Sequence, residues 1–202
     1  MSGQINRGSK FGEIIYSYAS NLQYKKFLEI GTWNGQGSTR CFIDALLNRD
    51  DDYLFVSIEA AENFYQQAYE FNKSVLSDKI KILHGRIVEE EELIHRDISD
   101  HRKDWLAGDI NNYKKCKNIW DNIEDYYDVV LLDGGEFSTF SEFTKLKDKT
   151  KVFLLDDIRE IKNTDVVAYL ITSPDWEEVL SANERNGFSV FKKADQQDLG
   201  SR

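Results

Sequence analysis

The sequence predicts an α/β fold built around a doubly wound, mostly parallel sheet, and three observations lead to this prediction. Strand-length apolar runs alternate with segments whose apolar residues recur at helical spacing. The first run breaks into a glycine-rich turn within residues 26–39, and this turn opens a helix. The last two strand-like runs flank Asn186 and Gly187, a pair typical of hairpins, so an antiparallel strand should close the seven-stranded sheet.

The length of 202 residues suits one domain with a single core, and no linker rich in proline, glycine or serine divides the chain. We therefore expect one domain over residues 1–193, followed by a polar, disordered tail over residues 194–202. Apolar runs are too short to cross a membrane, and the polar first residues lack the apolar segment of a signal peptide. We expect a soluble, cytoplasmic protein without a membrane partner.

The net charge is −10 at pH 7, with 36 acidic and 26 basic side chains. Proteins bind nucleic acids through clustered basic side chains, and this sequence has no such cluster. A nucleic-acid partner is therefore not expected, and the oligomeric state stays open. Cys41 and Cys116 are isolated in the sequence, which predicts two reduced thiols in helices.

The first half of the chain alternates between helical and strand-like segments. Residues 11–22 carry apolar groups at helical spacing, and we expect this helix to cover the rim of a ligand pocket. Short apolar runs further on predict buried strands. The predicted strands cover residues 26–30, 53–58 and 79–86, and predicted helices begin at residue 39 and cover residues 61–76.

The second half shows the same alternation. Thr139 and Glu142 have the spacing of a capping box that opens a helix. Another helix should end before Pro174, the only proline in the chain. The predicted strands cover residues 126–133, 151–155, 176–180 and 188–192, and the predicted later helix covers residues 163–172.

The glycine turn has an unusual spacing. Three residues separate Gly31 from Gly35, and Glu29 stands two residues before the first glycine, whereas a dinucleotide-binding turn follows G-x-G-x-x-G. The pattern resembles motif I of the class I S-adenosylmethionine methyltransferases. The resemblance implies a Rossmann-like class I methyltransferase fold and S-adenosyl-L-methionine as the cofactor; a ligand-free glycine turn is the alternative. The contacts that it implies here are Glu29, Gly31, Thr32, Asn34, Gly35 and Ser38.

Three further strand ends are predicted to contact the cofactor, and one of them is Asp133, at the end of the fourth strand. Glu59 follows the second strand about twenty residues after the glycine turn, where a carboxylate can accept both ribose hydroxyls. The alternative is an ordinary acid at a helix start, favoured by the helix dipole. Gly85 and Arg86, together with His84 and Ile87, should lie beside the adenine, although a histidine at a strand end is as often structural.

Residues 93–122 form an insertion longer than a crossover needs, and the insertion contains Trp105, Tyr113 and Trp120. Such an insertion usually determines specificity; the alternative is that its aromatic residues only pack the extra helices. The acidic run over residues 89–92 reads as a solvated helix start, because four adjacent acids cannot all face one ion.

Acids follow the fourth and fifth predicted strands. Asp133 precedes two glycines and Glu136, and Asp156 and Asp157 end the fifth strand. This arrangement resembles the metal-dependent O-methyltransferases, including those that act on sugars of macrolides and on rhamnosyl groups. The resemblance implies that Asp133, Asp156 and Asp157 hold Mg²⁺ or Mn²⁺, ions that prefer hard oxygen ligands.

That assignment carries a geometric condition. Consecutive residues of a strand point to opposite faces, so Asp156 and Asp157 can reach one ion only if the chain bends between them. The alternative is that one of the two acids caps a helix or pairs with a lysine. Lys162 and Asn163 follow these acids and are expected to orient the substrate or Asp157.

Methyl transfer to a hydroxyl needs a base, because an alcohol is a poor nucleophile until it loses its proton. The resembling subgroup often has a histidine three residues after the fourth-strand acid, where this chain has Glu136. Glu136 is the predicted base and Asp133 its catalytic neighbour; a hydrogen-bonding role in the loop is the alternative for Glu136.

The resemblance therefore implies an O-methyltransferase, and we expect its acceptor to be a sugar hydroxyl, such as that of rhamnose in a glycan or glycoside. A catechol or another small molecule is the main alternative acceptor. A nicotinamide-dependent oxidoreductase is disfavoured by the glycine spacing, and a non-catalytic domain by the intact acids. The chain could also be one part of a larger glycan-modifying enzyme.

Overall fold

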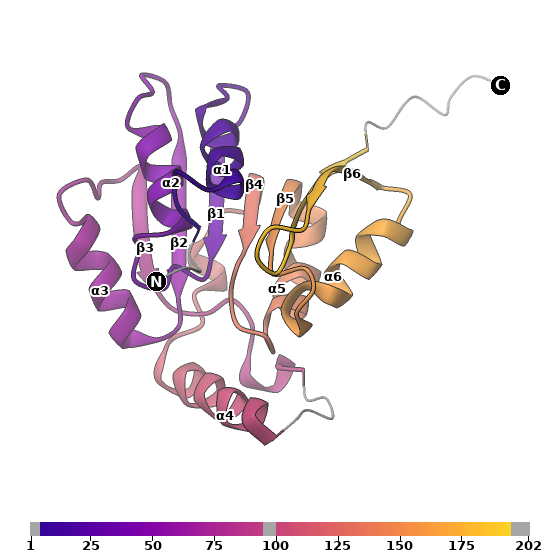
Figure 1. Cartoon of the computed structure of the whole chain (residues 1–202). Helices are drawn as coiled ribbons and strands as arrows, with labels where there is room; N and C mark the ends of the chain where they lie inside the picture. Colours follow the sequence, from indigo (N-terminus) through magenta and orange to yellow (C-terminus); the bar gives the residue numbers. More distant parts are fainter. Residues whose placement is uncertain (1–4, 95–99, 195–202) are drawn as a thin grey trace.

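The computed structural model describes residues 5–94 and 100–194. Its seven strands form one sheet in the order β3-β2-β1-β4-β5-β7-β6 (Figure 1). Neighbours among the first five strands are parallel, and β7 is antiparallel to both β5 and β6. The predicted doubly wound sheet with an antiparallel last strand is confirmed. The strands are β1 (Lys26–Ile30), β2 (Leu54–Glu59), β3 (Ile80–His84), β4 (Tyr127–Leu132), β5 (Thr150–Asp156), β6 (Trp176–Ala182) and β7 (Phe188–Lys193).

The helices largely follow the predicted segments. The third helix ends four residues early, at Asn72, whose buried side-chain amide turns back to the carbonyl groups of Ala68 and Gly35. The sixth begins two residues early, at Ile161. No helix of residues 5–94 and 100–194 is long and apolar enough to cross a bilayer. The α-helices are α1 (Lys10–Ser20), α2 (Ser38–Leu46), α3 (Glu62–Asn72), α4 (Asp100–Lys115), α5 (Thr139–Leu146) and α6 (Ile161–Thr172), and the 3₁₀ turns are η1 (Glu90–Glu92), η2 (Trp120–Asn122) and η3 (Lys147–Lys149).

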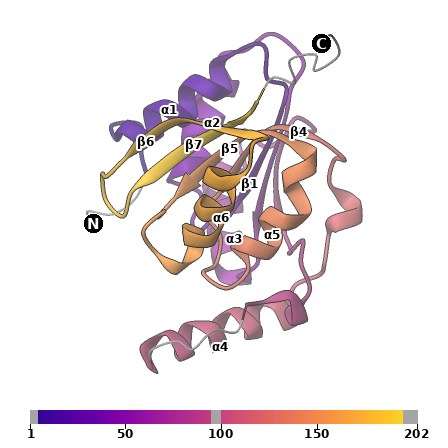
Figure 2. The same ribbon diagram turned by 90° about the vertical axis from the view of Figure 1, so that its right-hand side faces the viewer.

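Two apolar clusters hold helices on both faces of the sheet. Along β4, Val129 and Leu131 join the cluster that packs α1 and α2, while Val130 and Leu132 join the cluster that packs α5 and α6. This alternation follows from the two-residue period of a strand. Figure 2 shows α1 and α2 on one side of the sheet and α5 on the other. A run that is apolar at every position is thus buried on both faces of the sheet.

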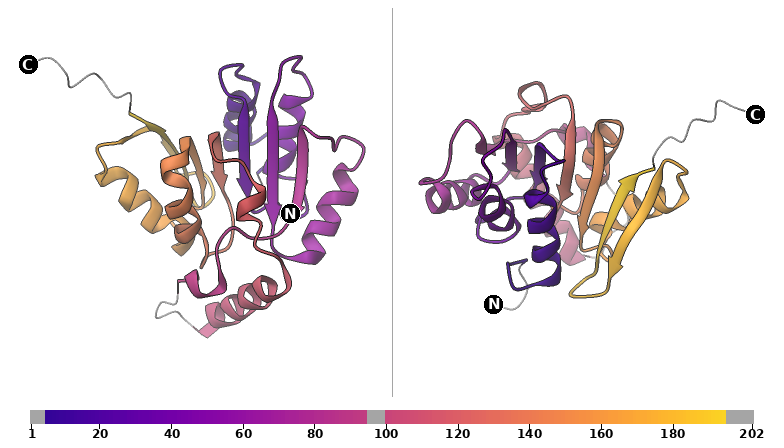
Figure 3. Two further views of the ribbon diagram at one scale, coloured as in Figure 1. Left: turned by 180° about the vertical axis from the view of Figure 1, so that it is seen from behind. Right: turned by 90° about the horizontal axis from the view of Figure 1, so that it is seen from above.

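The connections reverse direction between β1 and β4. The chain runs from β1 outward through β2 to β3, and then returns to β4 and runs through β5 to the closing hairpin. Where the connections of two neighbouring parallel strands lead in opposite directions, a crevice forms at the carboxyl ends of those strands. Helix α4 crosses beneath those ends (Figures 1 and 3). The predicted insertion therefore lies where a ligand would bind.

Two local predictions are wrong. The capping box is absent: α5 begins at Thr139, and the Glu142 side chain is buried and accepts a hydrogen bond from the Tyr113 hydroxyl instead. Helix α1 does not cover the pocket rim, because its apolar face packs into the cluster with α2. Among residues 5–20, only Ile5 lines the cavity. Both errors arise where long-range packing overrides a local pattern.

The two cysteines are buried free thiols, as expected for reduced side chains. Cys41 lies within α2, and Cys116 is the first residue after α4. Burial raises the pKa of the Cys41 thiol to about 12, which makes it unreactive at neutral pH. The predicted disordered tail falls on residues 195–202, outside the described residues.

Candidate active site

The two glycines of the turn let other backbone segments approach closely. Gly31 has a φ of 95°, and a Cβ atom at this position would lie 2.2 Å from the Asp133 carbonyl oxygen. Gly35 has a φ of 73°, and a Cβ atom there would lie 2.9 Å from the Cα atom of Ala68. Any larger residue would push β4 or α3 away from the turn. The glycines therefore fix the turn between two neighbouring elements.

Glu29 lies fully buried beneath the turn. Its carboxylate accepts hydrogen bonds from the hydroxyls of Ser38 (2.5 Å), Thr39 (2.7 Å) and Ser57 (2.5 Å). Burial raises the pKa of Glu29 to about 7, and the three hydroxyls oppose this shift. Glu29 thus anchors the start of α2 to β1 and β2.

A cavity of about 390 Å³ opens above the turn at the carboxyl ends of the strands. Glu29, Asn34 and Gly35 do not line it; the Asn34 side chain accepts a hydrogen bond from the backbone N–H of Gln36. These three residues stabilise the turn from within it or from beneath it and do not face the cavity. The predicted cofactor residues that line the cavity are Gly31, Thr32, Ser38, Glu59, Gly85, Arg86 and Asp133.

Glu59 is the last residue of β2, and its side chain folds back over the turn. One carboxylate oxygen accepts from the backbone N–H of Trp33 (2.7 Å) and the other from that of Ala61 (2.9 Å). Burial raises the pKa of Glu59 to about 7. Each oxygen keeps a further lone pair for a ligand hydroxyl.

Gly85, Arg86 and Ile87 line the cavity just after the end of β3. The Arg86 guanidinium donates to the carbonyl oxygens of Tyr113 (3.0 Å) and Val88 (2.8 Å). His84 does not line the cavity: its Nε2 lies 3.2 Å from the Ala60 carbonyl oxygen, and its ring stacks on Tyr65. His84 is therefore structural, as the alternative interpretation proposed.

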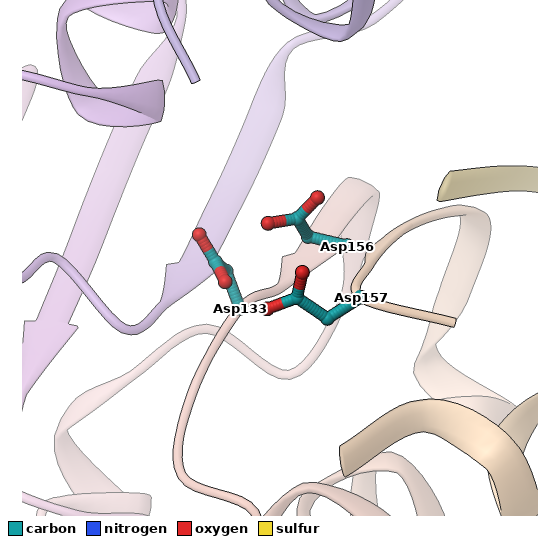
Figure 4. A group of neighbouring side chains, drawn as sticks. All are labelled: Asp133, Asp156 and Asp157. Carbon is teal, nitrogen blue, oxygen red and sulfur yellow. The ribbon is translucent and has the colours of Figure 1, made fainter. Parts of the chain in front are cut away.

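Asp133, Asp156 and Asp157 gather at the ends of β4 and β5 (Figure 4). Each offers one carboxylate oxygen, and these oxygens all lie within 4.8 Å of one another. Asp157 has a φ of 52°, so the chain bends directly after the strand. The bend turns two consecutive acids to one place, which meets the geometric condition for a shared ion.

Two basic side chains partly neutralise these acids. The Lys162 ammonium lies 2.6 Å from Asp133 Oδ1 and 2.9 Å from Asp157 Oδ2, and the Arg185 guanidinium lies 3.3 Å from Asp156 Oδ2. When all three carboxyls are ionised, the two cations leave one negative charge uncompensated. Burial and the neighbouring acids raise the pKa of Asp156 to about 7. An all-oxygen donor set with excess negative charge fits a hard divalent cation, with Lys162 as an outer partner.

A second hollow of about 590 Å³ lies beside the first, between α4 and the loops after β4 and β5. Asp109, Gly134, Gly135 and Asp157 line both hollows. These four residues therefore mark the place where a cofactor in the first hollow would meet a substrate in the second.

Glu136, the predicted base, is held by α4. The Arg102 guanidinium donates to Glu136 Oε2 at 2.7 Å and to Glu160 Oε2 at 2.9 Å. The Arg102 side chain is 18% exposed and that of Glu136 is 17% exposed. Arg102 thus joins the start of α4 to the loop after β4 and to the start of α6.

Of the three aromatic residues of the insertion, one faces the second hollow. Trp105 lines the second hollow and is 53% exposed. Tyr113 is buried, with its hydroxyl bonded to Glu142, and Trp120 packs against the core with Lys149 over its ring. The packing interpretation holds for Tyr113 and Trp120.

Sequence reasoning missed Asp109 altogether and assigned the buried Glu142 to a capping box. The available signal lay in α4, where Arg102, Trp105, Asp109 and Tyr113 recur at spacings of three and four residues. That spacing places all four on one side of a helix. It would have marked the insertion as a helix with one functional side.

Comparison with known proteins supports the fold. No family model matches the sequence, and no curated protein matches it significantly. Solved structures do match. An O-methyltransferase from Bacillus cereus in complex with S-adenosylhomocysteine is 14% identical, with a TM-score of 0.63 over 91% of this chain and 80% of that one. The chain has the class I methyltransferase fold.

Two more structures with this fold contain the cofactor or its product. A methyltransferase from Podospora anserina bound to S-adenosylhomocysteine is 15% identical, with a TM-score of 0.62 over 91% of this chain and 78% of that one. The O-methyltransferase TomG from Streptomyces achromogenes, in complex with S-adenosylmethionine, is 16% identical, with a TM-score of 0.59 over 91% and 79%. At these identities the similarity extends to the fold.

Proposed function

We propose that this protein is an S-adenosylmethionine-dependent O-methyltransferase. The observation that carries the proposal is the cavity above the glycine turn, bordered by Glu59 at the end of β2 and opening into a second hollow beside three acids. The solved structures with this fold include methyltransferases that hold S-adenosylmethionine or its product.

In the proposed complex, the cofactor lies in the first hollow. The Glu59 carboxylate accepts both ribose hydroxyls, and the backbone around Gly85 lies beside the adenine. The methionine part lies over Gly31 and Ser38, which places the sulfonium near Asp133 and the junction of the two hollows.

The acceptor is proposed to be a sugar hydroxyl, as on rhamnose in a glycan or glycoside. Trp105 offers an exposed aromatic face, and polar side chains such as Glu160 and Asn186 line the rest of the second hollow. A sugar ring presents apolar C–H faces to an aromatic side chain and hydroxyls to polar ones. A catechol has the same vicinal diol and remains the alternative acceptor.

Asp133, Asp156 and Asp157 would hold Mg²⁺ or Mn²⁺. Such an ion supplies Lewis acidity, which lowers the pKa of a hydroxyl that binds to it. The chain itself positions the reactants: Gly134 and Gly135 leave room between the two hollows, and Arg102 fixes α4 over the acceptor. An acceptor oxygen that is already held in line with the methyl group reacts faster, because the entropy cost of orienting the two reactants is met on binding.

The proposal is tested by calorimetry and by a labelled acceptor panel. S-adenosylhomocysteine should bind the purified protein, and tight binding of NAD with no response to S-adenosylhomocysteine would overturn the assignment. Radiolabelled S-adenosylmethionine is then offered with methyl α-L-rhamnoside and with 3,4-dihydroxybenzoate in parallel. Methyl transfer to the catechol alone would refute the sugar assignment and leave the methyltransferase assignment intact.

A further inference from the structure

Asp109 has a special position in the molecule. It lies on α4, in the middle of the insertion, and it is one of the residues that line both hollows. Opposite it, the loop after β4 has a glycine: a Cβ atom at Gly135 would lie 2.8 Å from Asp109 Oδ2. The glycine lets the carboxylate of Asp109 come close to the loop between the two hollows.

The carboxylate of Asp109 also differs from its neighbours in having no partner. Within residues 5–94 and 100–194, no hydrogen bond or ion pair to Asp109 is found. Around it, Glu59 accepts from backbone N–H groups, Glu136 from Arg102, Asp133 from Lys162 and Glu142 from Tyr113. All the lone pairs of Asp109 are therefore available to a ligand.

Its surroundings are acidic. Glu136 faces it from the loop after β4, and the Glu59 and Glu142 carboxylates approach from β2 and α5. On its own helix, Arg102 is engaged by Glu136 and Glu160. Burial and the charge of Glu136 together raise the pKa of Asp109 to about 6.

We propose that Asp109 is the general base of the methyl transfer, an inference that rests on the proposed function. Asp109 takes the proton of the acceptor hydroxyl as the acceptor oxygen forms a bond to the methyl carbon of the sulfonium. The carbon–sulfur bond breaks, and its electron pair stays on sulfur, giving S-adenosylhomocysteine. The proton then passes from Asp109 to solvent through the open side of the second hollow.

The other acids are less suited to this role. Glu136 is fixed by Arg102 and Asp133 by Lys162, so a base at either position would have to break an ion pair to accept a proton. Glu142 is fully enclosed and bonded to Tyr113. An unpaired carboxylate whose pKa lies near neutrality is both ionised and basic enough to act at pH 7.

The kinetic test compares two substitutions on α4 in the full chain. Asp109→Asn removes the base with little change in shape, and Asp104→Asn changes an exposed acid of the same helix. With whichever acceptor of the panel is methylated, Asp109→Asn should lower kcat by about 10² to 10⁴, while Asp104→Asn should not. S-adenosylhomocysteine should bind both variants as it binds the parent, which separates this result from a failure of cofactor binding.

The pH dependence gives a readout that a structural role would not change. For the parent, kcat should rise with pH through about 6 as Asp109 loses its proton, and this limb should vanish in Asp109→Asn and partly return in Asp109→Glu. A carbon-13 titration of labelled aspartate carboxyls, which needs no acceptor, should show one group near pH 6 that is missing in Asp109→Asn. A kcat within about threefold of the parent, or an Asp109 carboxyl that titrates near 4, would overturn the proposal.

Discussion

At the residue scale, the acids near the cofactor cavity differ in what they contact, and the contacts separate their roles. Glu29 is surrounded by three hydroxyls beneath the turn and cannot meet a ligand. Glu59 accepts from two backbone N–H groups and still faces the cavity. A pattern of acids in a sequence does not distinguish these two environments, because both residues end or nearly end a buried strand.

Replacing Glu59 by Ala should weaken binding of S-adenosylhomocysteine by about 1 to 3 kcal/mol, because the ribose hydroxyls lose a charged acceptor. Isothermal titration calorimetry measures the change. Glu62→Ala, an exposed acid three residues later, serves as the control and should bind as the parent does. Equal affinities for the two variants would show that Glu59 does not contact the ribose.

Glu29 should make stability depend on pH. Its pKa is about 7 in the folded protein against 4.5 ordinarily, so the folded state holds its proton over a range where the unfolded state has lost it. The free energy of unfolding should therefore fall as pH rises from about 4.5 to 7, by at most about 3 kcal/mol from this group. Urea unfolding at pH 5 and pH 8 measures the fall.

Substituting Glu29→Gln should reduce that fall, because the side chain no longer titrates. Glu177→Gln, at an exposed position of β6, should leave it unchanged. If Glu29→Gln shows the same pH dependence as the parent, the fall in stability comes from other buried acids. Glu59 and Glu142 are such acids, because burial also raises their pKa values.

At the element scale, α4 differs from the other helices in where it lies relative to the sheet. It crosses the carboxyl ends of the strands instead of covering a face of the sheet (Figure 3). It contacts the rest of the molecule through the Arg102 ion pairs and the Tyr113 hydroxyl, and Leu106 and Ile110 pack against the apolar cluster. Its position therefore depends on this apolar packing together with the two ion pairs of Arg102.

Substituting Arg102→Met removes both ion pairs that fix the start of α4, and KM for the acceptor should rise while the affinity for S-adenosylhomocysteine stays the same. The loss of global stability should be small, about 0 to 1 kcal/mol, because the ion pairs are near the surface. Hydrogen exchange over residues 100–115 should quicken. The control is Lys114→Met, which removes an ion pair between the other end of α4 and Glu90 of η1 and should change none of these properties. A similar rise in KM in the control would refute the role of Arg102 in positioning α4.

At the scale of the whole molecule, the acid cluster exists only because two strands far apart in the sequence become neighbours. Asp133 follows β4, and Asp156 and Asp157 come from the end of β5, which pairs with β4 in parallel register. The Asn163 side chain joins the two strand ends by donating to the carbonyl oxygens of Leu132 and Asp156. The cluster is thus a property of the assembled sheet.

If this cluster binds a divalent ion, Mn²⁺ should bind the purified protein, as measured by loss of the free-ion signal in electron paramagnetic resonance. Asp157→Asn should weaken that binding at least tenfold, because one charged oxygen ligand becomes neutral. Asp125→Asn, a fully exposed acid before β4, is the control. Full methyl transfer in excess EDTA, together with no bound Mn²⁺, would show that Lys162 and Arg185 are the only cations that the cluster needs.

The sequence by itself determined the fold and most of the strand ends that form the cavity. Gly31 and Gly35, the apolar runs and the Asn186-Gly187 pair are local signals: each reports a backbone conformation or a buried face that needs no knowledge of distant residues. The capping box predicted at Thr139 is also a local signal, and it was wrong because the distant contact between Glu142 and Tyr113 outweighs the local pattern.

Only the tertiary structure decided which acids near the cavity are paired with a basic side chain and which are free to meet a ligand. Arg102 reaches Glu136 across 34 residues, and Lys162 reaches Asp133 across 29. The spacing along α4 places Asp109 on one side of the helix, but no local pattern places it opposite Gly135. These pairings depend on where α4 and α6 pack against the finished sheet. The free energy that selects them comes from burial and charge in three dimensions, which a one-dimensional pattern of residues does not contain.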